Sequence, residues 1–401
     1  MINFLIVMIF SFSIFGCQKE EERPGDSDLN LLENDDWDLV WSDEFDGNEL
    51  DISKWNKLRW RPGWVNNELQ AYTDRDTNIF LKDGYLVLQG LVEPGYFGTD
   101  YTGFDYSSDY TSGRINTDDK VSRTYGRFDV SAKLPKGNGS WPAIWMLGES
   151  ISTVAWPDCG EIDIMEHVGF DEGMIHGSIH TGEYNHMNNT QKSGAKFLST
   201  ATDSFHVYSL EWSPHYLRYL IDNQPYFFVY NDSDGDTGKW PFDEPHYIIL
   251  NLAIGGDWGG AQGISPSAFP MKMLVDYVRV FKKSDAYKDV SVTFKVDMKN
   301  QNVSETGVWL SGGNISSGQP GGIQMNQSVD SSIWEITLTL PPHSSYTYKF
   351  RNGYFPNSWQ GGWEVIEGDC GVGQYNDRSL TVSGMDTLLA SVCFGECTAC
   401  D

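Results

Sequence analysis

The feature that most restricts the fold of this sequence is a regular alternation of short apolar runs with turns rich in Gly, Asn, Asp and Pro, from Trp37 to about Lys283. Runs of this kind are residues 85–89, 126–132 and 247–252, and residues 208–223 read as two strands joined at Ser213-Pro214-His215. No long amphipathic helix interrupts the alternation. Many short strands in one region predict an all-β fold, a sandwich of two sheets with jelly-roll topology.

A second β region follows a short polar connector. Residues 282–289 read KKSDAYKD, and a new alternation begins at Val290. The remaining residues, 290–401, are enough for one small sandwich. We therefore expect one domain over residues 37–283 and a second, smaller β-sandwich over 290–401.

Four of the six cysteines lie near the C-terminal end, at Cys370, Cys393, Cys397 and Cys400. An even, local set in an exported chain predicts two disulfides. Three pairings are possible, and we favour Cys370–Cys393 with Cys397–Cys400. A zinc site is the alternative, although only one C-x-x-C is present and no His lies near it. Cys159 is left unpaired and is expected to face a core.

The first sixteen residues are almost wholly apolar and are followed by Cys17. This run is too short to span a bilayer comfortably and is typical of a signal peptide. Residues 13–17 resemble a bacterial lipobox, in which Cys17 is lipidated, although Phe15 is bulky and no basic residue precedes the run; an ordinary secretory signal is the alternative. We expect a signal over residues 1–17 and a disordered acidic tether over 18–36. The resemblance implies export and a lipid anchor in the outer membrane, with the protein exposed at the cell surface.

The formal net charge is −28, so the chain repels phosphate backbones, and nucleic acid is excluded as an expected partner. The charge also disfavours polyanionic substrates such as sulfated galactans. Neutral ligands remain open. The chain has 15 Trp, and flat aromatic faces suit pyranose rings, although core packing is the alternative for each.

Three acids lie in the strand-like stretch GEIDIMEHVG, at Glu161, Asp163 and Glu166. Alternation places Glu161 and Asp163 on one face, whereas a regular strand would turn Glu166 away from it. One β-bulge between Asp163 and Glu166 would shift the phase of the alternation and return Glu166 to the same face. The change in spacing therefore predicts a bulge.

Three carboxylates on one face repel one another, and such a cluster is typical of a catalytic site. Retaining glycosidases use two carboxyl groups about 5–5.5 Å apart, one as nucleophile and one as general acid. Asp163 is expected to hydrogen-bond Glu161, and its charge is expected to keep Glu166 protonated. The alternatives are a solvated acidic strand and a calcium site.

The sequence resembles glycoside hydrolase family 16, and within it the bacterial laminarinases (endo-β-1,3-glucanases). The family motif E-[IL]-D-[IVAF]-x-E is present as EIDIME, and the resemblance covers about residues 37–283. Further matching stretches are residues 41–45, 66–73, 125–128, 141–147, 176–181 and 275–280. The resemblance implies a jelly roll with an open cleft, Glu161 as nucleophile, Asp163 as its helper and Glu166 as general acid/base. It implies no cofactor for catalysis.

Chemistry and resemblance together suggest residues that bind sugar in the cleft. Trp141, Trp145 and Trp156 are expected to stack on glucosyl rings. Hydrogen bonds to hydroxyls are expected from Asn67, Glu68 and Arg114. His180, which shares a face with His176 and Ser178, is a binding or supporting candidate, and Trp258 lies on a glycine-rich loop that we place at the edge of the cleft.

Two further expectations come from resemblance. Many family members hold a structural calcium, whose ligands here would be the Asp276 side chain, the Gly84 carbonyl and backbone near Glu44. Residues 290–401 resemble the immunoglobulin-like or starch-binding-like sandwiches of secreted polysaccharide enzymes. In this domain a sugar platform of Trp309, Trp359 and Trp363 competes with a disulfide-tied spacer that packs these rings in its core.

The sequence therefore predicts a monomeric, surface-anchored, retaining endo-β-1,3-glucanase whose partner is a β-glucan and which contacts the membrane only through its lipid. The same fold acting on mixed-linkage β-1,3-1,4-glucan, agarose or carrageenan is the nearest alternative. A non-catalytic glucan-binding protein is the alternative from another class, and the presence of both glutamates argues against it.

Overall fold

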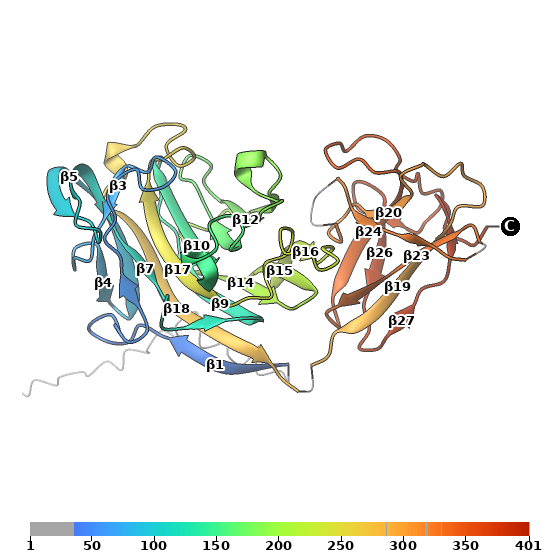
Figure 1. Ribbon diagram of the computed structural model, residues 1–401, viewed down its shortest axis with the longest axis horizontal. Coiled ribbons are helices and arrows are strands. Elements are labelled where there is room, and N and C mark those ends of the chain that lie inside the picture. The colour runs from blue at the N-terminus through green and yellow to red at the C-terminus, as the bar shows by residue number, and fades with distance from the viewer. Residues whose placement is uncertain (1–35, 286, 317–319, 330, 401) are drawn as a thin grey trace, which may run out of the picture.

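The computed structural model describes residues 36–285, 287–316, 320–329 and 331–400 (Figure 1). Within these ranges the regular elements are β-strands apart from three short 3-10 helices, η1 (Glu149–Ser152), η2 (His186–Asn188) and η3 (Pro266–Ala268). None of the helices in the described ranges has the length and apolar character needed to cross a membrane. The predicted all-β class is confirmed. The expected signal peptide, the lipidated Cys17 and residues 18–35 of the expected tether lie outside the described residues.

The larger domain is a sandwich of two sheets (Figure 1). The sheet that we call the cleft sheet has the order β13-β12-β11-β10-β17-β7-β2, with β8 paired to β17. Its strands are β2 (Asn56–Lys57), β7 (Arg114–Asn116), β8 (Ser122–Arg123), β10 (Ser140–Gly148), β11 (Glu161–Glu166), β12 (Met174–His180), β13 (Lys192–Phe197) and β17 (His246–Ile254).

The second sheet, the back sheet, has the order β16-β15-β14-β9-β18-β5-β6-β3, with β1 paired to β18 and β4 to β5. Its strands are β1 (Trp37–Asp43), β3 (Gln70–Tyr72), β4 (Ile79–Lys82), β5 (Tyr85–Thr99), β6 (Asp105–Ser112), β9 (Gly126–Lys133), β14 (His206–Trp212), β15 (Tyr216–Ile221), β16 (Gln224–Tyr230) and β18 (Met271–Lys283). The predicted break at residues 213–215 separates β14 from β15.

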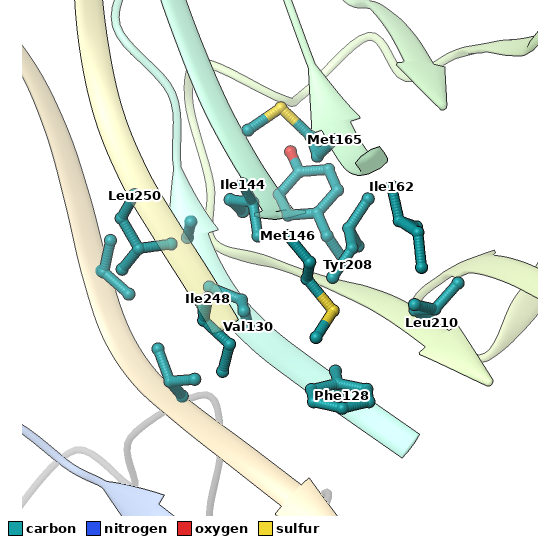
Figure 2. Close-up of a cluster of buried hydrophobic side chains, with 14 of the residues drawn as sticks. Phe128, Val130, Ile144, Met146, Ile162, Met165, Tyr208, Leu210, Ile248 and Leu250 are labelled. Atoms are coloured by element: carbon teal, nitrogen blue, oxygen red, sulfur yellow. The ribbon is translucent and has the colours of Figure 1, made fainter. Parts of the chain in front are cut away.

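The core lies between the two sheets because each strand of the cleft sheet turns alternate side chains inward. Figure 2 shows Ile144 and Met146 of β10 and Ile248 and Leu250 of β17 meeting back-sheet residues such as Phe128. All of these side chains are fully or almost fully buried. The intervening residues of the same strands therefore point out of the sandwich, on the other face of the cleft sheet.

The smaller domain begins at β19 and consists of two five-stranded sheets, of order β22-β23-β19-β27 with β28 on β19, and β21-β20-β24-β26-β25. Its strands are β19 (Val290–Asp297), β20 (Val308–Ser311), β21 (Ile323–Gln324), β22 (Asn326–Gln327), β23 (Ile333–Leu340), β24 (Ser345–Asn352), β25 (Gly371–Val372), β26 (Asp377–Thr381), β27 (Thr387–Leu388) and β28 (Val392–Cys393). Both sheets contribute to one apolar core that includes Val292, Phe294 and Phe350.

The two domains share a packed junction. Phe228 of β16 contacts the ring of Tyr346, with centroids 5.5 Å apart, and both belong to the core cluster of the smaller domain. At the connector, Asp289 accepts hydrogen bonds from Lys283 Nζ at 2.7 Å and from Tyr216 Oη at 2.9 Å. The connector is therefore tied to the larger domain by a mostly buried ion pair.

The four C-terminal cysteines form two disulfides, but the expected pairing is wrong. The bonds are Cys370–Cys397 and Cys393–Cys400. After Cys393 the chain turns back, since Cys393 N donates to the Thr398 carbonyl, and this brings Cys400 beside Cys393. The same turn lays residue 396 against Glu367, next to Cys370, so Cys397 is the cysteine within reach. Cys159 is unpaired and buried, as expected.

Candidate active site

The predicted bulge is present in β11. Against β12, Glu161 pairs with His180 and Asp163 with Ser178, and the register then shifts before Glu166 pairs with His176. Against β10 on the other side, Met165 and Asp163 pair with the consecutive residues Ile144 and Trp145, so the shift is the same. Ile164 is therefore the additional residue, and both neighbouring strands accommodate it.

The bulge places all three acids on the outer face of the cleft sheet. Glu161, Asp163 and Glu166 line one cleft, whereas Ile162, Ile164 and Met165 are buried in the core. Figure 2 shows Ile162 and Met165 on the core side of this strand. Two adjacent residues, Ile164 and Met165, thus both face inward, which a strand without a bulge does not allow.

Each glutamate is held by a tryptophan. Trp156 Nε1 donates to Glu161 Oε2 at 2.9 Å, and Trp141 Nε1 donates to Glu166 Oε1 at 3.0 Å. The sequence suggested only a stacking role for these two indoles. Their N–H groups also fix the direction in which each carboxylate points.

The expected hydrogen bond from Asp163 to Glu161 is not present among the described residues. Asp163 Oδ2 instead accepts from Ser178 Oγ at 2.5 Å and lies 3.3 Å from His180 Nε2. His180 Nε2 also lies 3.9 Å from Glu161 Oε1. Because the imidazole lies between the two acids, Asp163 positions Glu161 through His180 rather than directly.

The titration of the cluster follows from burial and from this arrangement. Burial raises the pKa of Glu161 and of Glu166, and the negative charge of Asp163 raises both further. Burial lowers the pKa of His180, but its hydrogen bond to Asp163 and the surrounding carboxylates outweigh that effect and raise the pKa to about 9. His180 is therefore an imidazolium at neutral pH, inside a cluster of acids.

The cleft has a volume of about 420 Å³ and extends well beyond the acids. The Arg114 guanidinium lies between the rings of Trp60 and Trp145, at 4.1 and 4.9 Å from their centroids. The Glu68 carboxylate accepts from Gln70 at 2.7 Å and from Tyr72 at 3.2 Å. Burial raises the pKa of Glu68, against the opposing charge of Arg114. Trp141, Trp145, Trp156, Glu68 and Arg114 all line the cleft, as the sequence suggested.

Three other candidates lie elsewhere. Asn67 does not line the cleft: its amide donates to Asp257 at 2.9 Å, and the neighbouring Asn66 lines the cleft instead. Both asparagines have a φ of 51°, so they form a tight turn in which Asn66, rather than Asn67, faces the cleft. Trp258 packs edge-on against Trp141 and His176, and His180 lies behind the carboxylates, so both support the cleft without lining it.

The sequence analysis missed several cleft residues, namely Trp60, Trp64, Asn66, His186, Met187 and Asn251. Three of them have a signal that is visible in the sequence. Trp60 and Trp64 flank the turn-forming residues Pro62 and Gly63, and Asn251 is the one polar residue in the buried run YIILNLAI. Asn251 Oδ1 accepts from Trp145 Nε1 at 2.6 Å, so this polar residue orients an indole in the cleft.

Comparison with known proteins agrees with this geometry. A profile of the glycosyl hydrolases family 16 matches residues 63–279. The chain belongs to glycosyl hydrolases family 16. The profile spans both the cleft sheet and the back sheet and contains Glu161, Asp163 and Glu166.

Individual relatives in family 16 include proteins named for β-glucan. A beta-glucanase of Rhodothermus marinus is 42% identical over 287 residues, covering 70% of this chain and 93% of the relative. The X-ray structure of the laminarinase from Rhodothermus marinus matches with a TM-score of 0.57 and 45% identity, over 62% of this chain and 98% of that one.

A third relative spans both domains. A keratan-sulfate endo-1,4-beta-galactosidase of Sphingobacterium multivorum is 30% identical over 424 residues, covering 97% of this chain and 94% of the relative. The two-domain architecture of this family 16 chain is thus matched over nearly its whole length by a protein named for another polymer.

The residues expected to hold a structural calcium lie near one another in the back sheet, where β1 and β5 both adjoin β18. Asp43 of β1 pairs with Val278, and Val275 of β18 pairs with Leu86, so Glu44, Gly84 and Asp276 lie at neighbouring register positions. The Asp276 carboxylate is buried, and the available donors are all oxygen atoms, which suits calcium. The Glu44 carboxylate accepts a hydrogen bond from Arg279 at 2.8 Å, so the group near Glu44 that would bind the ion is the backbone carbonyl, as in the expected ligand set. These residues fit the ion, which would link β1, β5 and β18; its binding remains a prediction.

Proposed function

We propose that this chain is a retaining endo-β-1,3-glucanase that hydrolyses laminarin-type glucans. The observation that supports it most is the bulged strand β11, which directs Glu161 and Glu166 into one cleft. Each of the two carboxylates accepts a hydrogen bond from a tryptophan N–H. Family 16 enzymes are retaining hydrolases, and two relatives that are 42% and 45% identical are named a beta-glucanase and a laminarinase.

The two glutamates differ in the charges around them, which suggests their roles. The pKa of Glu161 is raised by burial and Asp163, and it is lowered in turn by His180, the Trp156 N–H and Arg114. The pKa of Glu166 is raised by burial, by Asp163 and by Glu161, and it is lowered by the Trp141 N–H and His180. The additional positive charge of Arg114 beside Glu161 favours the carboxylate at Glu161 and the proton at Glu166.

This placement of the charge on Glu161 and the proton on Glu166 suits a double displacement. Glu166 protonates the glycosidic oxygen while the Glu161 carboxylate attacks the anomeric carbon, giving a glycosyl-enzyme. Glu166, now ionised, takes a proton from water as the water attacks the same carbon, and this step restores Glu161. His180 and Asp163 act as positioning residues, since His180 Nε2 lies 3.3 Å from Asp163 and 3.9 Å from Glu161 and so links the two acids.

The neutral character of the substrate is suggested by the charges that line the cleft. Glu68, Glu161, Asp163 and Glu166 are acidic, whereas Arg114 is the one Arg or Lys among its lining residues. Such a surface disfavours the sulfate groups of keratan sulfate or carrageenan. Neutral glucan rings can instead stack on Trp60, Trp141 or Trp156.

The test is an assay of the purified chain on laminarin, mixed-linkage β-1,3-1,4-glucan, agarose, carrageenan and keratan sulfate. We expect the highest kcat/KM on laminarin, internal cleavage with oligosaccharide products, and a β-anomer as the first product by proton NMR. Faster hydrolysis of a galactan would contradict the substrate assignment, and an α-anomer would contradict the double displacement.

We further propose export and lipid anchoring at the outer membrane through Cys17. The support is the apolar run that ends at Cys17, together with two disulfides, which form in oxidising compartments. Metabolic labelling with palmitate should mark the chain, and Cys17→Ser should abolish the label. Labelling that persists in Cys17→Ser would contradict the anchor.

A further inference from the structure

We propose that the smaller domain has a second, non-catalytic glycan-binding site, which we call the Trp359 pocket, and that it binds the neutral β-glucan that the cleft hydrolyses. The pocket is lined by Trp359, Trp363, Lys349, Tyr375, Asn376 and Asp377, among others. The choice of β-glucan rests on the proposed function; the existence of the site rests on the observations below.

Two parallel tryptophan rings form one wall. The rings of Trp359 and Trp363 have centroids 6.2 Å apart and an interplanar angle of 12°. Trp359 is 55% exposed, although burying so large an apolar side chain would stabilise the fold. Trp363 Nε1 donates to the Trp359 carbonyl at 2.8 Å, which links the two positions. Trp363 is half-buried and supports Trp359, whose exposed flat ring is suited to stacking on a pyranose ring.

The loop that presents these rings is held by a buried arginine. The Arg351 side chain donates to the carbonyls of Ser358, Gln360 and Gly361 at 2.8 to 2.9 Å, and to the carbonyl of Pro320. The same guanidinium lies 4.2 Å from the ring centroid of Trp363. Because the loop is already fixed, a ligand would bind without the entropic cost of ordering it.

The opposite wall, formed by residues 364–377, is also held by contacts to buried groups. Glu364 is buried and binds Arg378 through both carboxylate oxygens, at 3.0 and 2.7 Å. The disulfide Cys370–Cys397 ties the segment that leads to Tyr375, whose side chain is 73% exposed. Asn376 Nδ2 donates to the Ile366 carbonyl at 3.1 Å, closing this segment on itself. These contacts hold both walls of the pocket in place.

The chemistry of the pocket favours an uncharged sugar chain. Its volume is about 620 Å³, within the range of ligand sites. Lys349 and Asp377 can hydrogen-bond hydroxyl groups, and the charge of Glu364, which also lines the pocket, is balanced by Arg378. Trp309, the third ring expected in a platform, lies outside this pocket and stacks on Tyr354 at 4.4 Å.

The test uses the full chain made inactive by Glu161→Gln, so that substrate is bound and not consumed. Partition onto insoluble β-1,3-glucan, mixed-linkage glucan, cellulose and agarose is measured for this chain and for versions with Trp359→Ala, Trp363→Ala or Trp359→Phe added. We expect Trp359→Ala to weaken retention by about fivefold or more, the size of one lost aromatic contact. Trp359→Phe should recover part of that loss because it keeps a flat ring.

The matched control is Phe97→Ala, an aromatic that is 68% exposed on β5 and lines neither the cleft nor the Trp359 pocket. It should leave retention unchanged. Hydrogen exchange provides a second measurement: bound glucan should protect peptides over residues 357–377. Thermal melts should show that each variant folds.

The outcomes separate the two proposals. If no β-1,3-glucan is hydrolysed but Trp359→Ala weakens retention on another polymer of the panel, the proposed function fails and the binding site stands. If retention and protection are the same with and without Trp359 and Trp363 on every polymer, the Trp359 pocket is overturned whatever the cleft hydrolyses.

Discussion

The cleft and the Trp359 pocket place aromatic and polar side chains side by side by two different means. In the cleft, Trp141, Trp145, Glu161 and Asn251 come from paired strands, so the register of the ladder sets their spacing. In the pocket, Trp359, Trp363 and Tyr375 come from loops, which have no ladder. These loops are held instead by the hydrogen bonds of Arg351, by the ion pair Glu364–Arg378 and by a disulfide.

The comparison shows where each site is vulnerable. Replacing a residue of the cleft should change chemistry and leave the fold intact, because the strands remain paired. Replacing an anchor beneath the pocket should unfold the smaller domain locally and leave the chemistry intact. The following predictions test this division.

The largest effect is expected from Glu161→Gln. Loss of the nucleophile should lower kcat on laminarin by roughly 10⁴-fold or more, while the thermal unfolding temperature stays the same or rises because a buried charge is removed. Steady-state kinetics and calorimetry measure the two effects. Glu149→Gln, at an exposed position of η1, is the control and should change neither. Undiminished turnover in Glu161→Gln would refute the assigned nucleophile.

The next effect is expected from Glu364→Ala in the smaller domain. It leaves Arg378 buried without its partner and removes the acceptor for the Phe350 and Gly395 N–H groups, which should cost about 3–5 kcal/mol. Calorimetry should show a transition at lower temperature, with laminarin hydrolysis retained below it. Glu335→Ala breaks the more exposed pair with Lys295 and should cost about 1 kcal/mol or less. Equal losses in both variants would contradict the anchoring role.

Calcium removal should have a smaller effect, confined to the larger domain. If the ion binds at Asp276, its removal by EDTA should lower the stability of that domain by roughly 3 kcal/mol when the ion was near-saturating. Melts with EDTA and with added calcium should differ in the intact chain and coincide in Asp276→Asn. Identical melts in the intact chain would count against the site.

The smallest effect is expected in the pH profile of His180→Gln. The imidazolium, whose pKa is about 9, lowers the pKa of Glu161, so its loss should raise that pKa and move the acid limb of kcat/KM upward by about one pH unit. His206→Gln, whose ring pairs with Asp222 on the back sheet, should leave the limb in place. A limb that moves downward, or does not move, would contradict the role of His180.

The division between strand and loop also explains how much could be predicted. The alternation of side chains within one strand was sufficient to predict that Glu161, Asp163 and Glu166 share a face and that a bulge separates the last two. The face on which a side chain lies depends only on its position along its own strand. The Asn66–Asn67 turn and the disulfide pairing depend on positive φ angles and on a chain reversal after Cys393, which periodicity does not encode. Trp60, His186 and Asn251 enter the cleft from segments far apart in sequence, and only the folded chain brings these segments together.

The bulge at Ile164 has a consequence for comparing sequences in this fold. A strand can accommodate one additional residue in a bulge and still direct the same side chains to its outer face. The number of residues between two acids in the sequence therefore does not give the distance between their carboxylates. Proteins that differ by one residue at this point can therefore share one arrangement of reactive groups, and an alignment that forces a gap there describes the backbone rather than the chemistry.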